Sequence, residues 1–130
     1  MEKTNEKTNT IDDSSYEPLT AVYEHLRHSE DSAELHEFAR RELPDRSDQA
    51  AFSRATSLLE AVAGNINTPE EDRIYLATEM PFPNILVKLS EDSADKVRLA
   101  VAENKNAKNW LVGRLTKDSC NAVRNAALCN

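Results

Sequence analysis

Glycine, cysteine and aromatic residues are scarce in this chain of 130 residues, and each scarcity excludes a class of protein. The chain has 2 glycines, 2 cysteines and 5% aromatic residues. So few glycines leave no phosphate-binding loop and favour helices over a turn-rich β fold. Few aromatic side chains argue against a base-stacking surface for single-stranded nucleic acid. Cys120 and Cys129 have no histidine pair at zinc-ligand spacing, so we expect no zinc site, and in a cytosolic protein we expect free thiols rather than a disulfide.

Long apolar runs are also missing. The chain holds no stretch of about 18 apolar residues, so we expect no membrane-spanning helix. Residues 1–15 are polar and repeat the tetrapeptide Glu-Lys-Thr-Asn twice in succession. We interpret them as a disordered tail, because they lack both the apolar core of a secretion signal and enough apolar surface to fold. The sequence therefore predicts a cytoplasmic protein in which residues 16–130 form a single all-α domain.

Charge is distributed unevenly along the chain. The net charge is −7, yet residues 85–130 carry eight Lys and Arg against five Asp and Glu, a balance of +3, which leaves −10 for residues 1–84. Nucleic-acid binding needs a cationic surface, so we expect no direct binding of nucleic acid. The positive balance of residues 85–130 is compatible with an acidic partner. The alternative is a set of solvated helical faces that differ in charge without consequence.

Apolar residues at helical spacing predict three helices within residues 16–65. The first covers about 17–28. The second follows Asp31, which has N-cap and N3 spacing with Glu34, a capping box. The third begins after Asp45 and stops near Gly64.

A fourth helix start is predicted at Thr68-Pro69-Glu70-Glu71, with Thr68 as the N-cap and Pro69 in the first helical position. This helix must end before Pro81, because proline disfavours helical geometry at the residue before it.

The C-terminal part repeats itself at an offset of 26 residues. Residues 85–104 match 111–130, and looser copies of the same pattern cover 61–84. The matched positions include Asp92 with Asp118, Val97-Arg98 with Val123-Arg124, and Asn104 with Asn130. Each unit is predicted to form two short helices that bury their apolar faces only by stacking on neighbouring units. We therefore expect about three N-terminal helices over 16–65, followed by repeat units over 66–130 in a short right-handed α-solenoid.

The pattern Val97-Arg98-Leu-Ala-Val-Ala-Glu-Asn104, followed by Leu111, Leu115, Asp118 and Val123-Arg124, resembles the leucine-rich repeat variant family of HEAT-like α-solenoids. The resemblance is best over 61–130. It implies repeats in which a short helix, often 3₁₀, stacks against an α-helix, and it implies little about activity. The family's prolines are missing after Asn104. Some members carry an iron–sulfur cluster on a cysteine-rich segment, which this chain lacks, so we expect no cofactor.

Repeated arginines are the first candidate binding residues. Arg98 and Arg124 occupy equivalent positions, as do Asp92 and Asp118. One interpretation is an arginine ladder that faces an acidic ligand. The other is that each arginine pairs with an aspartate and ties neighbouring units together.

Trp110 is the second candidate, because it is the only tryptophan and lies near Lys105, Lys108 and Arg114. Tryptophan beside Arg and Lys is typical of a binding hot spot. The alternative is partial burial between repeats. His25 and His28 share a helix face but have no third ligand at a defined spacing, so we expect no metal there.

These observations favour a non-enzymatic protein–protein interaction module, with a regulatory role open. The proposed partner-binding residues are Trp110, Arg98, Arg124, Lys105, Lys108 and Arg114. The alternative is an acidic nucleic-acid mimic that inhibits a nucleic-acid enzyme, which requires the acids of 30–48 and 70–72 to line one ridge. No nucleophile or acid–base pair stands out, so we expect no enzyme. The weakly charged helix near the C-terminus leaves a homodimer through that end open.

Overall fold

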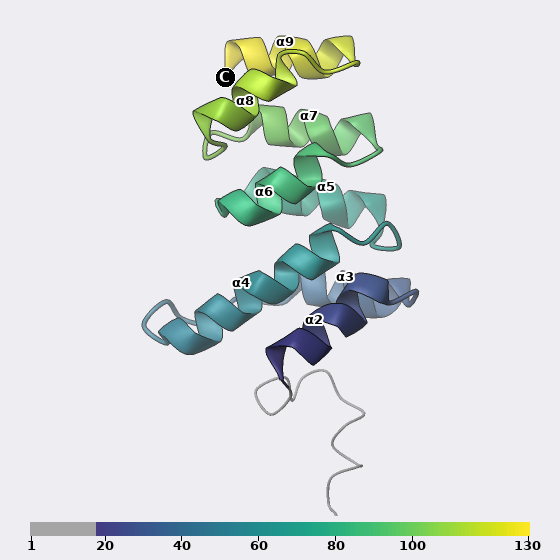
Figure 1. The fold of residues 1–130 in the computed structure, drawn as a ribbon, viewed down its shortest axis with the longest axis vertical. Coiled ribbons are helices and arrows are strands. Elements are labelled where there is room, and N and C mark those ends of the chain that lie inside the picture. The colour runs from purple at the N-terminus through teal and green to yellow at the C-terminus, as the bar shows by residue number, and fades with distance from the viewer. Residues whose placement is uncertain (1–17) are drawn as a thin grey trace, which may run out of the picture.

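The structure is a computed structural model that describes residues 18–130, and this part of the chain is helical, with eight helices and no strand (Figure 1). The all-α prediction is confirmed over these residues, whereas the tail predicted for residues 1–15 lies outside them. The helices are α2 (Leu19–His28), α3 (Ser32–Arg40), α4 (Gln49–Ala63), α5 (Glu70–Glu79), α6 (Pro83–Ser90), α7 (Asp95–Glu103), α8 (Asn109–Leu115) and α9 (Asn121–Cys129).

Most of these helices form two columns along the long axis of the molecule (Figure 1). Helix α7 packs between α5 and α9 in one column, and α6 packs between α4 and α8 in the other. Helices α2 and α3 form the N-terminal end, where α2 packs on α4 and α3 contacts α4 and α5. From α4 to α7, each helix therefore contacts a sequence neighbour and the next helix of its own column.

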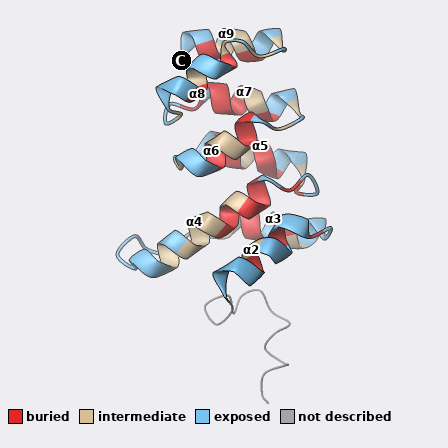
Figure 2. Ribbon diagram, in the orientation of Figure 1, coloured by how far each residue is buried: buried red, intermediate tan, exposed pale blue. Residues whose placement is uncertain are grey.

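A single apolar core runs along the middle of the stack, where the two columns meet (Figure 2). Leu76, Leu89, Val101 and Leu111 are among its fully buried side chains. Burying a side chain of this size contributes roughly 1.5–3 kcal/mol. No helix pair encloses this core alone, so the units depend on one another for stability.

The N-terminus of α3 agrees with half of the predicted capping box. Asp31 Oδ1 accepts hydrogen bonds from the N–H groups of Ala33 and Glu34, as an N-cap does. The Glu34 carboxylate does not return to the Asp31 N–H. It accepts from Ser29 Oγ and lies 2.9 Å from His25 Nε2, while the Asp31 N–H donates to Ser29 Oγ. Ser29 and His25 at the end of α2 therefore bind the two groups, the Glu34 carboxylate and the Asp31 N–H, that would bond to each other in a full capping box.

The predicted role of Thr68 as an N-cap is wrong. Helix α5 begins at Glu70 with Pro69 at the N-cap and no side-chain cap. Thr68 is 1% exposed, and its Oγ1 donates to the Val62 carbonyl at 2.7 Å. The last carbonyls of a helix have no intrahelical donor, and Thr68 supplies one to α4. Its hydroxyl therefore caps the C-terminus of α4 and not the N-terminus of α5.

Three asparagines that follow helices tie successive helices together. Asn65 Nδ2 donates to the carbonyls of Leu26 and Ser29 at the end of α2. Asn104 does the same to α5 and Asn130 to α7. Each amide thus satisfies carbonyls at a helix C-terminus that would otherwise lack a donor. This recurring bond is the structural reason for asparagine at the repeated position.

Candidate interaction surface

The structure holds Arg98 between two units. Its Nε donates to Asp118 Oδ2 at 2.8 Å, and its Nη1 donates to the Asp92 carbonyl at 2.8 Å. The side chains of Arg98 and Asp118 are 15% and 8% exposed. One unit earlier, Arg73 pairs with Asp92, with Nη1 donating to both carboxylate oxygens. Of the two interpretations of the repeated arginines, this geometry matches pairing between units, and it leaves little of Arg98 for a ligand.

The Arg98–Asp118 pair also perturbs both ionisable groups. Burial by itself raises the pKa of Asp118, but the hydrogen bonds from Arg98 and from the Cys120 N–H outweigh it and hold this pKa below its ordinary value. The same hydrogen bond raises the pKa of Arg98. Both groups therefore stay charged in the folded chain at neutral pH.

Arg124 is engaged within its own unit. Its Nη1 donates to the Asp118 carbonyl and its Nη2 to Asn121 Oδ1. Arg98 makes the first of these contacts to the carbonyl of Asp92, the equivalent residue. The repeated position thus fixes the loop before each long helix, and Arg124 keeps part of its guanidinium at the surface.

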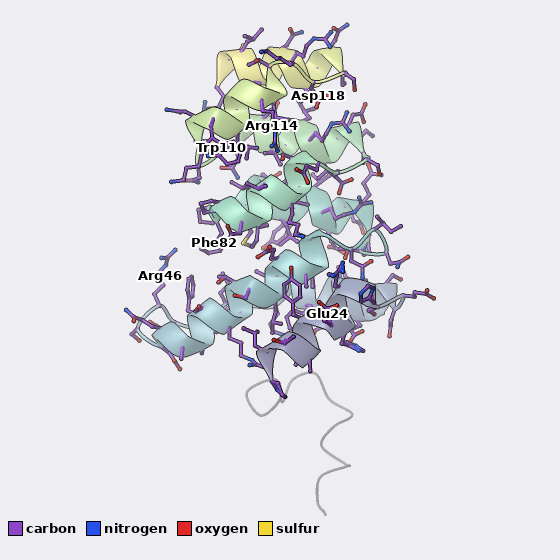
Figure 3. The ribbon with its side chains drawn as sticks, viewed as in Figure 1. Glu24, Arg46, Phe82, Trp110, Arg114 and Asp118 are labelled. Atoms are coloured by element: carbon purple, nitrogen blue, oxygen red, sulfur yellow. The ribbon has the colours of Figure 1, made fainter. Side chains whose placement is uncertain are left out.

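The other four predicted residues gather around α8 and are exposed. Trp110 is 57% exposed, and the Arg114 guanidinium carbon lies 5.5 Å from the centre of its ring (Figure 3). Arg114 also donates to Ser90 Oγ at 3.0 Å, which holds it against α6. Lys105 and Lys108 lie in the exposed segment that leads into α8. Trp110 is thus partly buried, as in the alternative, yet more than half of its surface is exposed to solvent.

Two residues of this region were missed by the sequence analysis. Gly113 and Lys117 are exposed, and Gly113 has no atom within 4 Å of the place where a Cβ would stand. Residues 104–117 contain four cations and no acid. That signal is visible in the sequence, but averaging charge over the whole C-terminal half hides it. We call these residues the α8 surface: Lys105, Lys108, Trp110, Gly113, Arg114 and Lys117.

No family model, curated protein or solved structure matches the chain. The α8 surface is therefore interpreted from its own chemistry. Helices long and apolar enough to cross a lipid bilayer are absent from the described part of the chain.

A second aromatic–arginine cluster lies on the same edge of the molecule, below Trp110 in Figure 3. The rings of Phe52 and Phe82 meet edge to face at 5.7 Å, and the Arg46 guanidinium carbon lies 4.7 Å from the Phe52 ring centre. Both phenylalanines are half-buried. This cluster therefore joins α4 to the start of α6, and it presents less free aromatic surface than Trp110.

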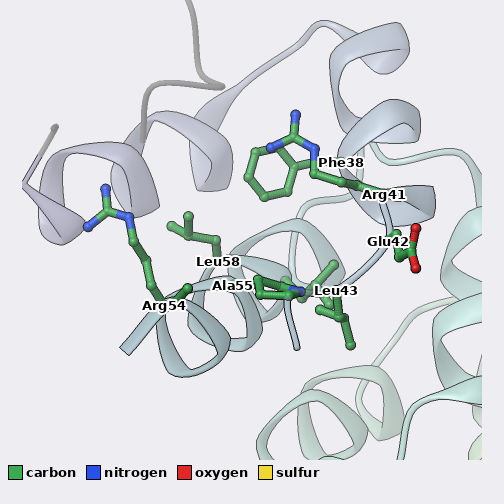
Figure 4. A pocket seen from close by; sticks show the side chains of 10 residues that line it. Phe38, Arg41, Glu42, Leu43, Arg54, Ala55 and Leu58 are labelled. Carbon is green, nitrogen blue, oxygen red and sulfur yellow. The ribbon is translucent and has the colours of Figure 1, made fainter. Parts of the chain in front are cut away.

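An apolar hollow of about 190 Å³ lies between the end of α3 and α4 (Figure 4). Leu58 and Ala55 of α4 face Phe38 and Leu43 across it. Its remaining lining residues are Arg41, Glu42, Pro44, Ala51, Arg54 and Leu59. None of these is a serine, cysteine or histidine, so the described lining offers no nucleophile and no metal-ligating ring. The hollow is large enough for one apolar side chain.

The histidines and cysteines do not assemble a reactive site. His36 Nδ1 lies 2.7 Å from a carboxylate oxygen of the buried Asp72. Cys120 Sγ lies 3.7 Å from a carboxylate oxygen of Asp95, and both cysteines are free thiols, as expected. Among residues 18–130 no group of three or more His, Cys, Asp or Glu is arranged to hold a metal ion.

Proposed function

We propose that this chain is a non-enzymatic protein-binding module that holds its partner on the α8 surface. The observation that carries the proposal is the exposure of Trp110, at 57%, beneath the Arg114 guanidinium. Binding energy in protein interfaces concentrates in a few Trp, Tyr and Arg residues. An exposed tryptophan with an arginine already placed over its ring is such a pair.

The proposal includes a HEAT-like, right-handed α-solenoid similar to the leucine-rich repeat variant family. Two columns of helices and the repeated asparagine and arginine bonds support it. Such a scaffold favours binding because the α8 surface is built on packed helices. Side chains ordered before binding cost less to immobilise when a partner arrives.

The acidic-mimic alternative is weaker, because several of the acids it requires are engaged within the chain. Asp72 is buried and held by His36 and Arg40. Glu37 is paired with Arg41. A phosphate mimic needs a row of exposed carboxylates, and these contacts remove members from that row.

The test is capture of partners by the tagged full-length chain from its native lysate, with and without nuclease. The Trp110→Ala variant removes the aromatic anchor. Ile66→Ala is the matched control, because Ile66 is 78% exposed and lies in the loop between α4 and α5. We expect one protein to be retained by wild type and by Ile66→Ala, to survive nuclease, and to be lost from Trp110→Ala.

Equal retention of that protein by all three forms would show that the α8 surface is not where it binds. Nuclease-sensitive material alone would refute the module. If the retained protein is a nucleic-acid enzyme and Trp110→Ala retains it as well as wild type does, the result would instead favour the acidic mimic. The homodimer through the C-terminal end stays a prediction, and Leu128, 70% exposed on α9, is the residue to vary when oligomeric state is measured.

A further inference from the structure

Gly113 has no structural reason to be a glycine. It lies inside helix α8 (Asn109–Leu115), faces solvent, and a Cβ added to it would meet nothing within 4 Å. Glycine is a poorer helix former than every residue except proline, so its presence weakens a helix of only seven residues. Nothing within the described chain needs this position to be bare.

The preceding unit shows that the fold accepts a side chain at this position. The residue 26 positions earlier is Val87 of α6, and α6 forms its helix with that valine packed against the core. The equivalent of Trp110 in α6 is Asn84. The exposed tryptophan and the bare glycine thus occur together in one unit and are both absent from its neighbour.

Gly113 lies on the same face of α8 as the proposed binding residues Trp110 and Arg114. Trp110, Gly113 and Arg114 follow the spacing i, i+3 and i+4, which places them along one face of α8, and Lys117 follows in the turn after this helix. The glycine leaves a gap on this face, where a side chain would otherwise stand. A chain that crosses this gap can approach the α8 backbone more closely than any side chain would allow.

Charge determines what kind of chain fits this face. Residues 104–117 have four cations and no acid, within a chain of net charge −7. The only acid within 4 Å of a described cation of the α8 surface is Glu91, whose carboxylate is 3.6 Å from Arg114. The side chains of Arg114 and Glu91 are 49% and 66% exposed. The neighbouring units keep Asp92 and Asp118 in their own pairs. The complement to this surface is therefore acidic.

We propose that the α8 surface binds an acidic segment of a partner protein, with the segment's backbone passing over Gly113. An apolar residue of the segment packs on Trp110, and its carboxylates face Lys108, Arg114 and Lys117. Lys108 and Lys117 flank α8, whose seven residues rise roughly 10 Å. About three extended residues span that distance. The inference rests on the proposed function and adds the chemistry of the partner to it.

A protein segment fits better than nucleic acid. Residues 1–84 carry a balance of −10, which repels a long polyanion. Trp110 is also the only aromatic residue among the exposed large hydrophobic side chains of residues 18–130, whereas strand-binding proteins stack several bases. A short acidic segment needs only the local cations.

The test uses synthetic peptides of about eight residues that alternate Glu with Leu or Phe. Trp110 is the only tryptophan, so its fluorescence reports binding at this surface directly. We expect a saturable change with the Glu peptides. We expect none with matched Gln peptides, and a loss of about tenfold in affinity when salt rises from about 0.05 to 0.5 M.

The decisive variants are Gly113→Gln and Gly113→Ala in the full-length chain. Gly113→Gln fills the gap, so we expect it to weaken peptide binding about tenfold or more, while the small Ala weakens it less than about threefold. Both variants should unfold at or above the wild-type midpoint, because both residues favour helix more than glycine does. Ser53→Gln, at an exposed position of α4, is the control for an added side chain.

Unchanged peptide affinity in Gly113→Gln overturns the path over Gly113. Equal binding of Glu and Gln peptides, or no saturable change with any Glu peptide, overturns the acidic partner. If a short oligonucleotide binds more tightly than every peptide, the partner is a nucleic acid and not an acidic protein segment. These outcomes are distinct from failure of the proposed function, which is read from the capture experiment with Trp110→Ala and needs no assumption about the partner's charge.

Discussion

Replacing Asn104 by alanine is expected to destabilise the whole stack, because this side chain bonds α7 to the end of α5. Asn104 is 6% exposed, and its Nδ2 donates to the carbonyls of Ala77 at 2.8 Å and Met80 at 3.0 Å. Its Oδ1 accepts from the Asn106 N–H at 2.7 Å. Asn104→Ala leaves two carbonyls and one N–H without these partners.

The magnitude follows from those three groups. A buried polar group that loses its hydrogen bond costs about 1 kcal/mol or more, so the free energy of unfolding should fall by about 3 kcal/mol. Domains of this size are stable by only about 5–15 kcal/mol. The loss should therefore be visible as a large shift of the urea midpoint, followed by circular dichroism and by Trp110 fluorescence.

Asn130→Ala is the matched control. Asn130 makes the equivalent bonds to the carbonyls of Ala102 and Asn104, but it is exposed, so water can replace its amide. We expect that variant to lose less than about 1 kcal/mol. An Asn104→Ala protein that unfolds within about 0.5 kcal/mol of wild type, the spread typical of surface changes, would refute the role given to the buried asparagine.

Two further predictions concern the Arg98–Asp118 pair. A double-mutant cycle of Arg98→Ala and Asp118→Ala, measured by urea unfolding, should give a coupling energy of about 1.5–3 kcal/mol. The reason is that the hydrogen bonds join charged groups that are mostly buried. A coupling energy near zero would contradict the role of this pair in joining the two units. The pH dependence has a defined sign: since the pKa of Asp118 is lowered in the folded chain, its stabilisation is present above the unfolded pKa of about 3.9 and is lost as pH falls through the folded value. The stability difference between wild type and Asp118→Asn should therefore shrink as pH drops below about 4, and a difference that grows there would reverse this reasoning.

The sequence predicted the helices well where each residue has a local role. Apolar residues at helical spacing predicted a third helix that stops near Gly64, and α4 ends at Ala63. Asp31 was recognisable as an N-cap because a cap bonds only to its own helix. Local chemistry of this kind can be read without knowing what the rest of the chain does.

Prediction failed where a side chain bonds to a distant element. Thr68 precedes a helix and has the composition of a cap, yet it donates to Val62 of the helix before it. Arg73 pairs with Asp92 as Arg98 pairs with Asp118, but it lies 25 residues before Arg98. A strict offset of 26 therefore missed it. Such choices depend on which partner packing brings near, and a spacing rule does not contain that information.

The internal repeat offers a way to separate structural residues from functional ones in a single chain. Positions that recur, such as Asp92 with Asp118 and Asn104 with Asn130, hold neighbouring helices together. The α8 surface consists mostly of positions that do not recur at the same offset. Where it has Lys117, the preceding unit has Glu91.

The same holds for Lys105, whose counterpart is Glu79, and for Lys108, whose counterpart is Phe82. A stack of equivalent units needs its ties in every unit, whereas a partner needs its contacts only once. The residues that break the repeat around α8 are therefore the ones that the stack does not need. That is the physical ground for proposing that this unit binds the partner and that Arg98 belongs to the scaffold.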